Sequence, residues 1–125
     1  MLQLLYVGIG GFIGAALRYL VSLGSNKIFL SQMPYGTLIV NVLGGILIGL
    51  IMELSLTSDA ISPNMKLLLT TGIMGGLTTF STFSYETIGL FSKGNISLGI
   101  LNVCLNLFLS LGGVLLGQYA AQKLI

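Results

Sequence analysis

Charged residues are so scarce in this chain that they leave four long uncharged stretches between them. Only 6% of the 125 residues are charged, against about a quarter in an ordinary soluble domain. A helix needs about 20 mostly apolar residues to cross a hydrocarbon core about 30 Å thick, and each stretch is close to that length. We therefore expect one all-α integral membrane domain over residues 1–125, with four transmembrane helices at about 4–24, 36–53, 66–91 and 95–121.

The remaining composition excludes several classes of protein. A net charge of +2 is too small to indicate nucleic-acid binding, and the absence of histidine leaves almost no ligands for zinc or haem. The single cysteine, Cys104, cannot form a disulfide within the chain and is expected to be a small apolar packing residue. No pairing of a nucleophile with a base and no phosphate-binding glycine loop occurs, so nothing supports an enzyme. The first apolar stretch lacks the basic start of a signal peptide, and we expect it to be retained.

Each expected helix carries two glycines four residues apart, a spacing that places both on one side of a helix. In lipid, helices associate by close backbone packing, which small residues permit. We therefore interpret these glycines as packing positions rather than as flexible ones. The pairs are Gly10 and Gly14, Gly45 and Gly49, Gly72 and Gly76, and Gly113 and Gly117.

Lysines are divided equally between the two sides of the membrane. If four helices alternate in direction, Lys66 and Lys123 lie on the side of the N-terminus, and Lys27 and Lys93 lie on the other. The positive-inside rule then compares two lysines on one side with two on the other, which leaves the orientation in the membrane undetermined. Four helices are also too few to enclose an aqueous path. We expect a homodimer whose two subunits are inserted in opposite directions.

The third stretch contains the most unusual segment of the chain, residues 75–84, with the sequence GGLTTFSTFS. Two adjacent glycines followed by five hydroxyl residues form a poor helix, because glycine costs about 1 kcal/mol and Ser and Thr offer competing hydrogen bonds. We expect a helix break here. Backbone freed at membrane depth must face protein, water or an ion, and transport proteins place binding sites at such breaks. The alternative is a packed interface of small residues.

Few polar side chains lie within the other stretches. Asn41 is a lone amide in the second, while Asn102, Asn106 and Ser110 form one polar stripe along the fourth because they repeat every four residues. Arg18 and Glu86 are expected near the same membrane face, where each can snorkel or lie at the mouth of a pore. No carboxylate lies at the centre of a helix, which argues against proton coupling in this chain.

In these residues the sequence resembles the CrcB/Fluc family of fluoride channels. The resemblance covers nearly the whole chain, and its most specific part is the GGLTTFSTFS segment with Glu86 after it. The other matching motifs, in chain order, are Gly10-Gly11-Phe12-Ile13-Gly14-Ala15 with Arg18-Tyr19, and Pro34-Tyr35-Gly36-Thr37 with Val40-Asn41. One departure is Asn106, which stands where relatives often have tyrosine.

The resemblance implies a fluoride-selective channel in the plasma membrane, built as an antiparallel dual-topology homodimer with two pores. Passive fluoride efflux through it would protect the cell from fluoride toxicity. It implies that Arg18 and Glu86 lie at the mouths of the pore, and that backbone carbonyls of Gly75 and Thr78 hold a structural sodium ion on the dimer axis. The residues that it places along the fluoride path are Asn41, Phe80, Ser81, Thr82, Phe83, Asn106 and Ser110.

Two other functions compete with this interpretation. A small multidrug-type transporter also has four helices, but it needs a central glutamate to exchange protons for cationic drugs. A non-transporting assembly subunit would use the glycine faces for packing alone. Ion flux from vesicles that contain the purified chain distinguishes both from a channel.

Overall fold

The computed structural model describes all 125 residues, and every regular element in it is a helix. Three long helices are each long and apolar enough to cross a membrane: α1 (Leu2–Ile28), α2 (Tyr35–Thr57) and α6 (Ile96–Leu124). The remaining segment is divided into shorter pieces: α3 (Pro63–Leu67), a π-helical stretch η1 (Leu68–Met74), α4 (Gly75–Leu77) and α5 (Phe80–Ser92). Four helical segments with a broken third are therefore confirmed, although no sequence pattern indicated the π-helical turns.

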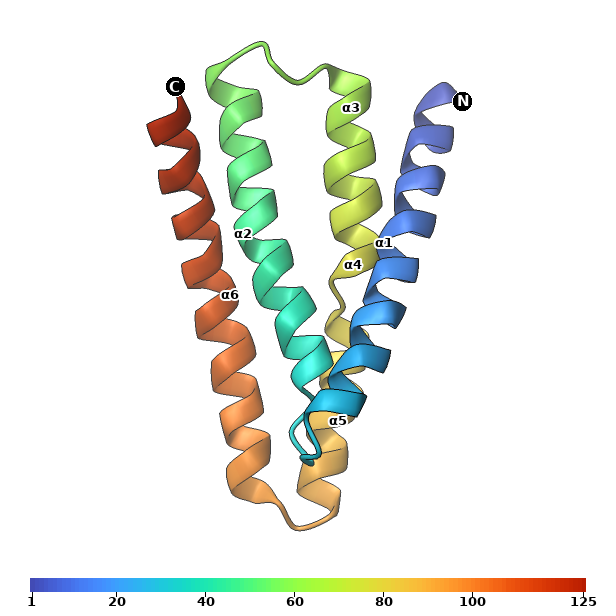
Figure 1. The fold of residues 1–125 in the computed structure, drawn as a ribbon, viewed down its shortest axis with the longest axis vertical. Helices are drawn as coiled ribbons and strands as arrows, with labels where there is room; N and C mark the ends of the chain where they lie inside the picture. The colour runs from blue at the N-terminus through green and yellow to red at the C-terminus, as the bar shows by residue number, and fades with distance from the viewer.

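The segments alternate in direction along the molecule. Both chain ends and the connection between α2 and α3 lie at one end of the bundle, while the other two connections lie at the opposite end (Figure 1). Lys66 in α3 and Lys123 in the last turn of α6 thus share one end, as expected. Lys27 closes α1 and Lys93 follows α5 at the other end.

Glycines allow close packing at two helix–helix contacts. Helix α2 packs on α6, where a Cβ atom on Gly45 would lie 2.7 Å from the carbonyl oxygen of Ser110. Helix α1 packs on η1 and α4, where a Cβ atom on Gly76 would lie 2.6 Å from the carbonyl oxygen of Gly11. Real Cβ atoms do not come so close to backbone atoms, so only glycine permits these contacts. The packing role predicted for the glycine pairs agrees with this geometry.

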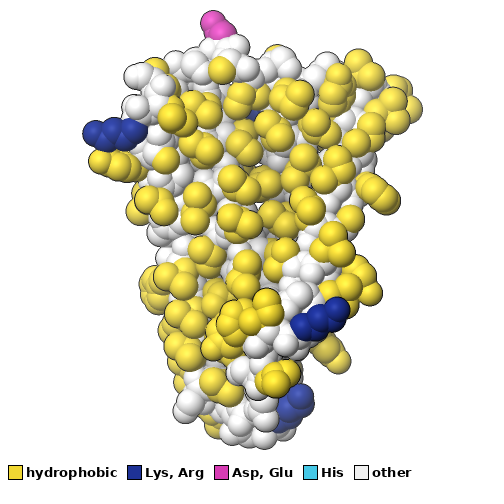
Figure 2. Space-filling view, viewed as in Figure 1, with side chains coloured by type: hydrophobic (Ala, Val, Ile, Leu, Met, Phe, Trp, Pro, Cys, Tyr) yellow, Lys and Arg dark blue, Asp and Glu magenta, His cyan; other side chains and the backbone are white.

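Very little of the chain is buried within a single copy. The apolar core is a cluster of Val40, Met74 and Leu77, and only 22 of the 125 residues are buried, so most large apolar side chains face outward. Apolar side chains cover most of the face in Figure 2, and most of the few charged ones visible there lie along its edges. In water such a surface would be unstable, whereas lipid or another protein chain covers it without cost.

The helix break consists of two extended residues, Thr78 and Thr79, with ψ angles of 158° and 125°. Thr79 is the N-cap of α5, because its hydroxyl oxygen accepts a hydrogen bond from the backbone N–H of Thr82 at 3.1 Å. Thr78 still completes the preceding turn, since its N–H donates to the carbonyl of Met74 at 3.0 Å. The C-terminal end of α4 and the N-terminal end of α5 consequently meet in the middle of the third segment (Figure 1).

Candidate functional site

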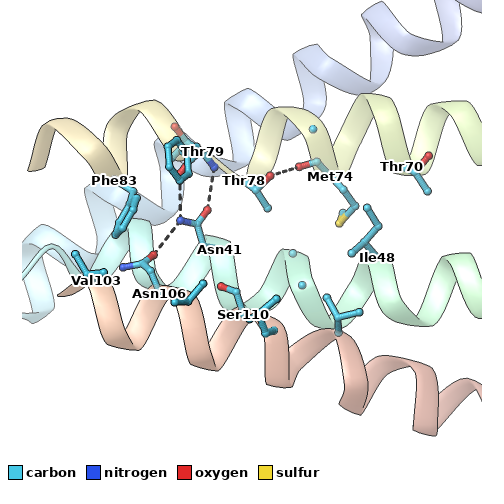
Figure 3. A pocket seen from close by; sticks show the side chains of 17 residues that line it. Asn41, Ile48, Thr70, Met74, Thr78, Thr79, Phe83, Val103, Asn106 and Ser110 are labelled. Atoms are coloured by element: carbon cyan, nitrogen blue, oxygen red, sulfur yellow. Dashed lines mark hydrogen bonds between the residues drawn. The ribbon is translucent and has the colours of Figure 1, made fainter. Parts of the chain in front are cut away.

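An open groove of about 610 Å³ runs along the face formed by α2, α6 and the broken segment. Its walls are mainly apolar, and the polar groups gather where the break faces the middle of α2 and α6 (Figure 3). Seven of the residues predicted from the sequence as site residues line it together: Asn41, Gly75, Thr78, Phe80, Phe83, Asn106 and Ser110. Ser81, Thr82, Arg18 and Glu86 do not line it.

Asn41 on α2 holds the backbone of the break. Its side-chain oxygen accepts a hydrogen bond from the N–H of Thr79 at 2.9 Å, and its Nδ2 donates to the carbonyl of the same residue at 3.1 Å. The second hydrogen of Nδ2 points to Oδ1 of Asn106 on α6, at 2.9 Å (Figure 3). An amide has two donor hydrogens, so both of those on Asn41 are used within the protein.

Asn106 also has no free amide hydrogen. Its Nδ2 donates to both the backbone oxygen and the side-chain oxygen of Asn102, at 2.9 and 3.0 Å. The amide of Asn102 in turn donates to the hydroxyl of Thr87 on α5 at 2.9 Å. The two asparagines of the polar stripe predicted on the fourth helix are therefore bound to protein groups, and they connect α6 to both α2 and α5.

Phe80 and Phe83 form a pair of rings in the first turn of α5. Their ring centroids are 5.5 Å apart, and the ring planes are tilted by 56°. Phe80 is 79% exposed, which is unusual for a large ring that lines a groove. The edge of an aromatic ring is the positive end of its quadrupole, and a helix N-terminus carries roughly half a positive charge. This part of the groove thus favours negative charge without holding a fixed cation.

The carbonyls of Gly75 and Thr78 are released by the break. In a continuous helix they would accept from the N–H groups of Thr79 and Thr82. The N–H of Thr79 donates to Asn41 instead, and the N–H of Thr82 donates to the hydroxyl of Thr79. Neither carbonyl receives a backbone hydrogen bond, and both residues line the groove.

The serine and threonine hydroxyls predicted along the path differ in their surroundings. Ser110 lines the groove, and its buried hydroxyl has no hydrogen-bond partner within the protein. Thr82 accepts a hydrogen bond from the hydroxyl of Thr79 at 3.1 Å, and Ser81 lies 3.4 Å from that hydroxyl. These two residues belong to the N-cap of α5 rather than to the groove.

The two charged residues lie outside the groove. Nε of Arg18 donates to the carbonyl of Gly76 at 3.0 Å, which places the guanidinium beside the last turn before the break. A cation is favourable at a helix C-terminus, so this bond stabilises the end of α4. Glu86 lines a second cavity, of about 300 Å³, together with Lys93, and one of its carboxylate oxygens is buried without a partner.

Three residues of the site were not among those predicted. Thr79 provides both backbone groups that Asn41 holds, although it lies within the segment that the sequence singled out. Asn102 stood in the predicted polar stripe, but nothing in the sequence distinguished it from its neighbours. Thr87 gave no signal, because a single threonine in a helix is common.

The chain matches known proteins over nearly its whole length. Residues 5–118 match the protein family described as "CrcB-like protein, Camphor Resistance (CrcB)". The chain belongs to the CrcB family. The predicted resemblance is thereby confirmed, and the four segments described above are those of a multi-pass membrane protein of this family.

Several members of the CrcB family carry the name "Fluoride-specific ion channel FluC". One from Clostridium perfringens is 61% identical over 124 residues, covering 99% of this chain and 97% of its own length. One from Clostridium novyi is 62% identical over 112 residues, covering 90% and 88%. One from a Shewanella species is 51% identical over 118 residues, covering 94% of each.

Proposed function

We propose that this chain is a fluoride-specific channel that lets fluoride leave the cell passively and so protects the cell from it. The observation that carries the proposal is the 61% identity, over 99% of the chain, to a protein named as a fluoride-specific ion channel. The groove supports the proposal, because the N-terminus of α5, the rings of Phe80 and Phe83 and the hydroxyl of Ser110 lie together there. No carboxylate lines the groove, so the proton-coupled transporter has no support at this site.

Fluoride is a small and strongly hydrated anion, and a pathway must replace its water with several weak donors. A fixed cation in the path would hold the ion too tightly for it to leave. The N-terminus of α5, the edges of Phe80 and Phe83, and the free hydroxyl of Ser110 meet this requirement. Ser81 and Thr82 extend the row of hydroxyls along the first turn of α5.

Asn41 and Asn106 belong to the pathway in a different way. All of their amide hydrogens are already donated within the protein. Their part is to hold the break open, so that the N-terminus of α5 and the two rings face the groove. Asn41 lines the groove and comes near a passing ion without being its main donor.

Glu86 and Arg18 act from outside the groove. The cavity that Glu86 shares with Lys93 lies toward the end where α5 meets α6, and it forms the mouth of the pore. Arg18 contributes positive charge on the far side of the break from the groove, where it attracts an anion without binding it in the path.

A second copy of the chain covers the groove. Its apolar walls and the exposed ring of Phe80 leave the pathway open along one side, and this surface requires a partner of the same character. The equal division of lysines between the two ends permits either orientation in the membrane. The two copies lie antiparallel, and each dimer contains two pores.

A sodium ion lies where the two copies meet at their breaks. The free carbonyls of Gly75 and Thr78 in each copy are hard oxygen ligands of the kind that this cation prefers, and they face the groove. Gly75 is exposed and has no neighbour closer than 3.8 Å to an added Cβ, so its carbonyl is accessible to a second chain. These carbonyls would hold the ion, and its positive charge would offset the repulsion between carbonyl oxygens of the two copies.

Efflux from vesicles tests the proposed function directly. The purified chain is reconstituted into lipid vesicles loaded with fluoride or with chloride, and release is followed with ion-selective electrodes. We expect rapid release of fluoride and retention of chloride. Equal release of both ions, or release of neither, would refute a fluoride-specific channel.

A further inference from the structure

Asn102 lies beneath the groove rather than in it. Its side chain is fully buried, with an exposed fraction of 0%, and it is absent from the groove wall. A buried amide is costly unless its donors and acceptors are used. Here Nδ2 donates to Thr87 and Oδ1 accepts from Asn106, at 2.9 and 3.0 Å.

The hydrogen bonds of this network have one possible direction. At one end, the backbone N–H and carbonyl of Thr79 fix which way the amide of Asn41 points, because a carbonyl only accepts and an N–H only donates. Nδ2 of Asn41 then requires an acceptor, so Asn106 must turn its oxygen toward it. At the other end, the backbone carbonyl of Asn102 requires the donor side of Asn106. Both ends agree.

The network begins and ends on α5. Thr87 donates its hydroxyl hydrogen to the carbonyl of Phe83 at 2.7 Å, and its oxygen receives the amide of Asn102. From there the bonds pass through α6 and α2 and return to Thr79, the N-cap of α5. Phe80 and Phe83 lie between these two attachment points, so the network fixes the part of α5 that presents the rings.

We infer that Asn102 is a positioning residue of the fluoride pathway, acting through Asn106 and Asn41 on the break and through Thr87 on α5. It touches neither the groove nor the ion. This inference rests on the proposed channel function. Without the Asn102 side chain, Asn106 retains only the backbone carbonyl of residue 102 as an acceptor, and the connection from Asn106 to Thr87 on α5 is lost.

The test uses variants that remove one contact while keeping the shape of the side chain. Thr87→Val removes the acceptor of Asn102, Thr87→Ser retains the hydroxyl, and Asn102→Leu removes the amide itself. Thr71→Val is the matched control, because Thr71 is exposed and lies outside both the network and the groove. Each full-length chain is reconstituted at low density, so that most vesicles hold one dimer or none.

Two quantities are measured in each preparation. The fraction of vesicles that release fluoride counts the folded channels, and the rate in those vesicles reports the flux through each channel. We expect Thr87→Val and Asn102→Leu to lower the rate about tenfold, as removal of residues that orient metal ligands does, with the fraction unchanged. Thr87→Ser should keep most of the rate, and Thr71→Val all of it. Asn102→Leu should lower the rate by a smaller factor in an Asn106→Leu background than in the unaltered chain, because the route through Asn106 is already lost there.

The possible failures are distinct. An unchanged rate with a smaller fraction of active vesicles would make Asn102 a residue of general stability and overturn the inference. Additive losses in the double variant would show that Asn102 does not act through Asn106, and would overturn it as well. No fluoride release from the unaltered chain would refute the channel function itself, and the inference with it.

Discussion

At the scale of single residues, the break combines two kinds of side chain with different tasks. The asparagines use all their donors on protein groups, whereas Phe80 and Ser110 face the groove with nothing bound to them. This separation matters because fluoride competes with water for every donor that it meets. In the proposed channel, donors already bound within the protein maintain the shape of the path, and the free donors and ring edges are the groups assigned to the ion.

Replacement of either ring of the pair tests that assignment. Phe80→Ile and Phe83→Ile keep an apolar side chain but remove the ring edge. We expect each to lower fluoride flux by at least about tenfold, which corresponds to about 1.4 kcal/mol in the barrier, with the dimer intact. Flux is measured by vesicle efflux and assembly by size-exclusion chromatography. Phe108→Ile serves as the control, because Phe108 is 64% exposed on α6 and lies outside the groove. If both Phe80→Ile and Phe83→Ile preserved the flux, the two rings would serve only in packing.

At the scale of helices, glycine contacts decide how α2 and α6 lie together. Gly117 packs on the backbone of Ile46, and Gly49 packs on the backbone of Val114. Nδ2 of Asn41 can reach Oδ1 of Asn106, at 2.9 Å, because these two helices are in backbone contact. The distance between the helices therefore sets the geometry of the network as well as the stability of the bundle.

Two glycines of α6 provide a matched comparison. An added Cβ at Gly117 would collide with the carbonyl of Ile46, so Gly117→Ala should destabilise the fold by about 1–3 kcal/mol. Gly112 has nothing within 4 Å of such an atom, and Gly112→Ala should be neutral or stabilising by up to about 1 kcal/mol. Thermal unfolding in detergent measures both. Equal effects would mean that the α2–α6 contact is less close than the structure has it.

At the scale of the whole molecule, one copy leaves its groove open along one side. Thr70 and Val103 lie at opposite ends of this groove (Figure 3). An antiparallel partner would bring Thr70 of one copy toward Val103 of the other, whereas a parallel partner would bring each residue toward its own counterpart. The proposed arrangement can therefore be identified from which pairs form.

Cross-linking distinguishes the two arrangements. Thr70→Cys and Val103→Cys are made separately in a Cys104→Ser background, and the two chains are produced together. We expect a short thiol cross-linker to join Thr70→Cys chains to Val103→Cys chains, with little product from either variant alone. A tag on the C-terminus should in addition be accessible from both sides of the membrane. Product from each variant alone would indicate a parallel dimer.

The proposed sodium site predicts a dependence of assembly on the cation. Replacing sodium by a large organic cation during purification should weaken the dimer and lower fluoride flux, because four carbonyl oxygens would then face one another without positive charge between them. Dimer dissociation on dilution and vesicle efflux are measured in both salts. Identical results in both would argue against a cation at Gly75 and Thr78.

The sequence by itself determined that the chain is a multi-pass membrane protein of four helical segments and that the third segment is broken. Both follow from local physics: 6% charge cannot cover a soluble surface, and GGLTTFSTFS cannot form a regular helix. The glycine spacing also determined that helices would touch. The family was recognisable for the same reason, since its motifs are contiguous in the chain.

Only the tertiary structure decided what the polar groups do. Asn41 and Asn106 are 65 positions apart, and no pattern along the chain shows that their amides bind each other and leave no free donor. Arg18 and Gly76 are 58 positions apart, and their contact stabilises the end of α4 rather than leaving the arginine to snorkel. Thr87 and Asn102 acquire their roles in the same way. A hydrogen bond depends on distance and direction in space, and these are set by the packing of helices that lie far apart in the sequence.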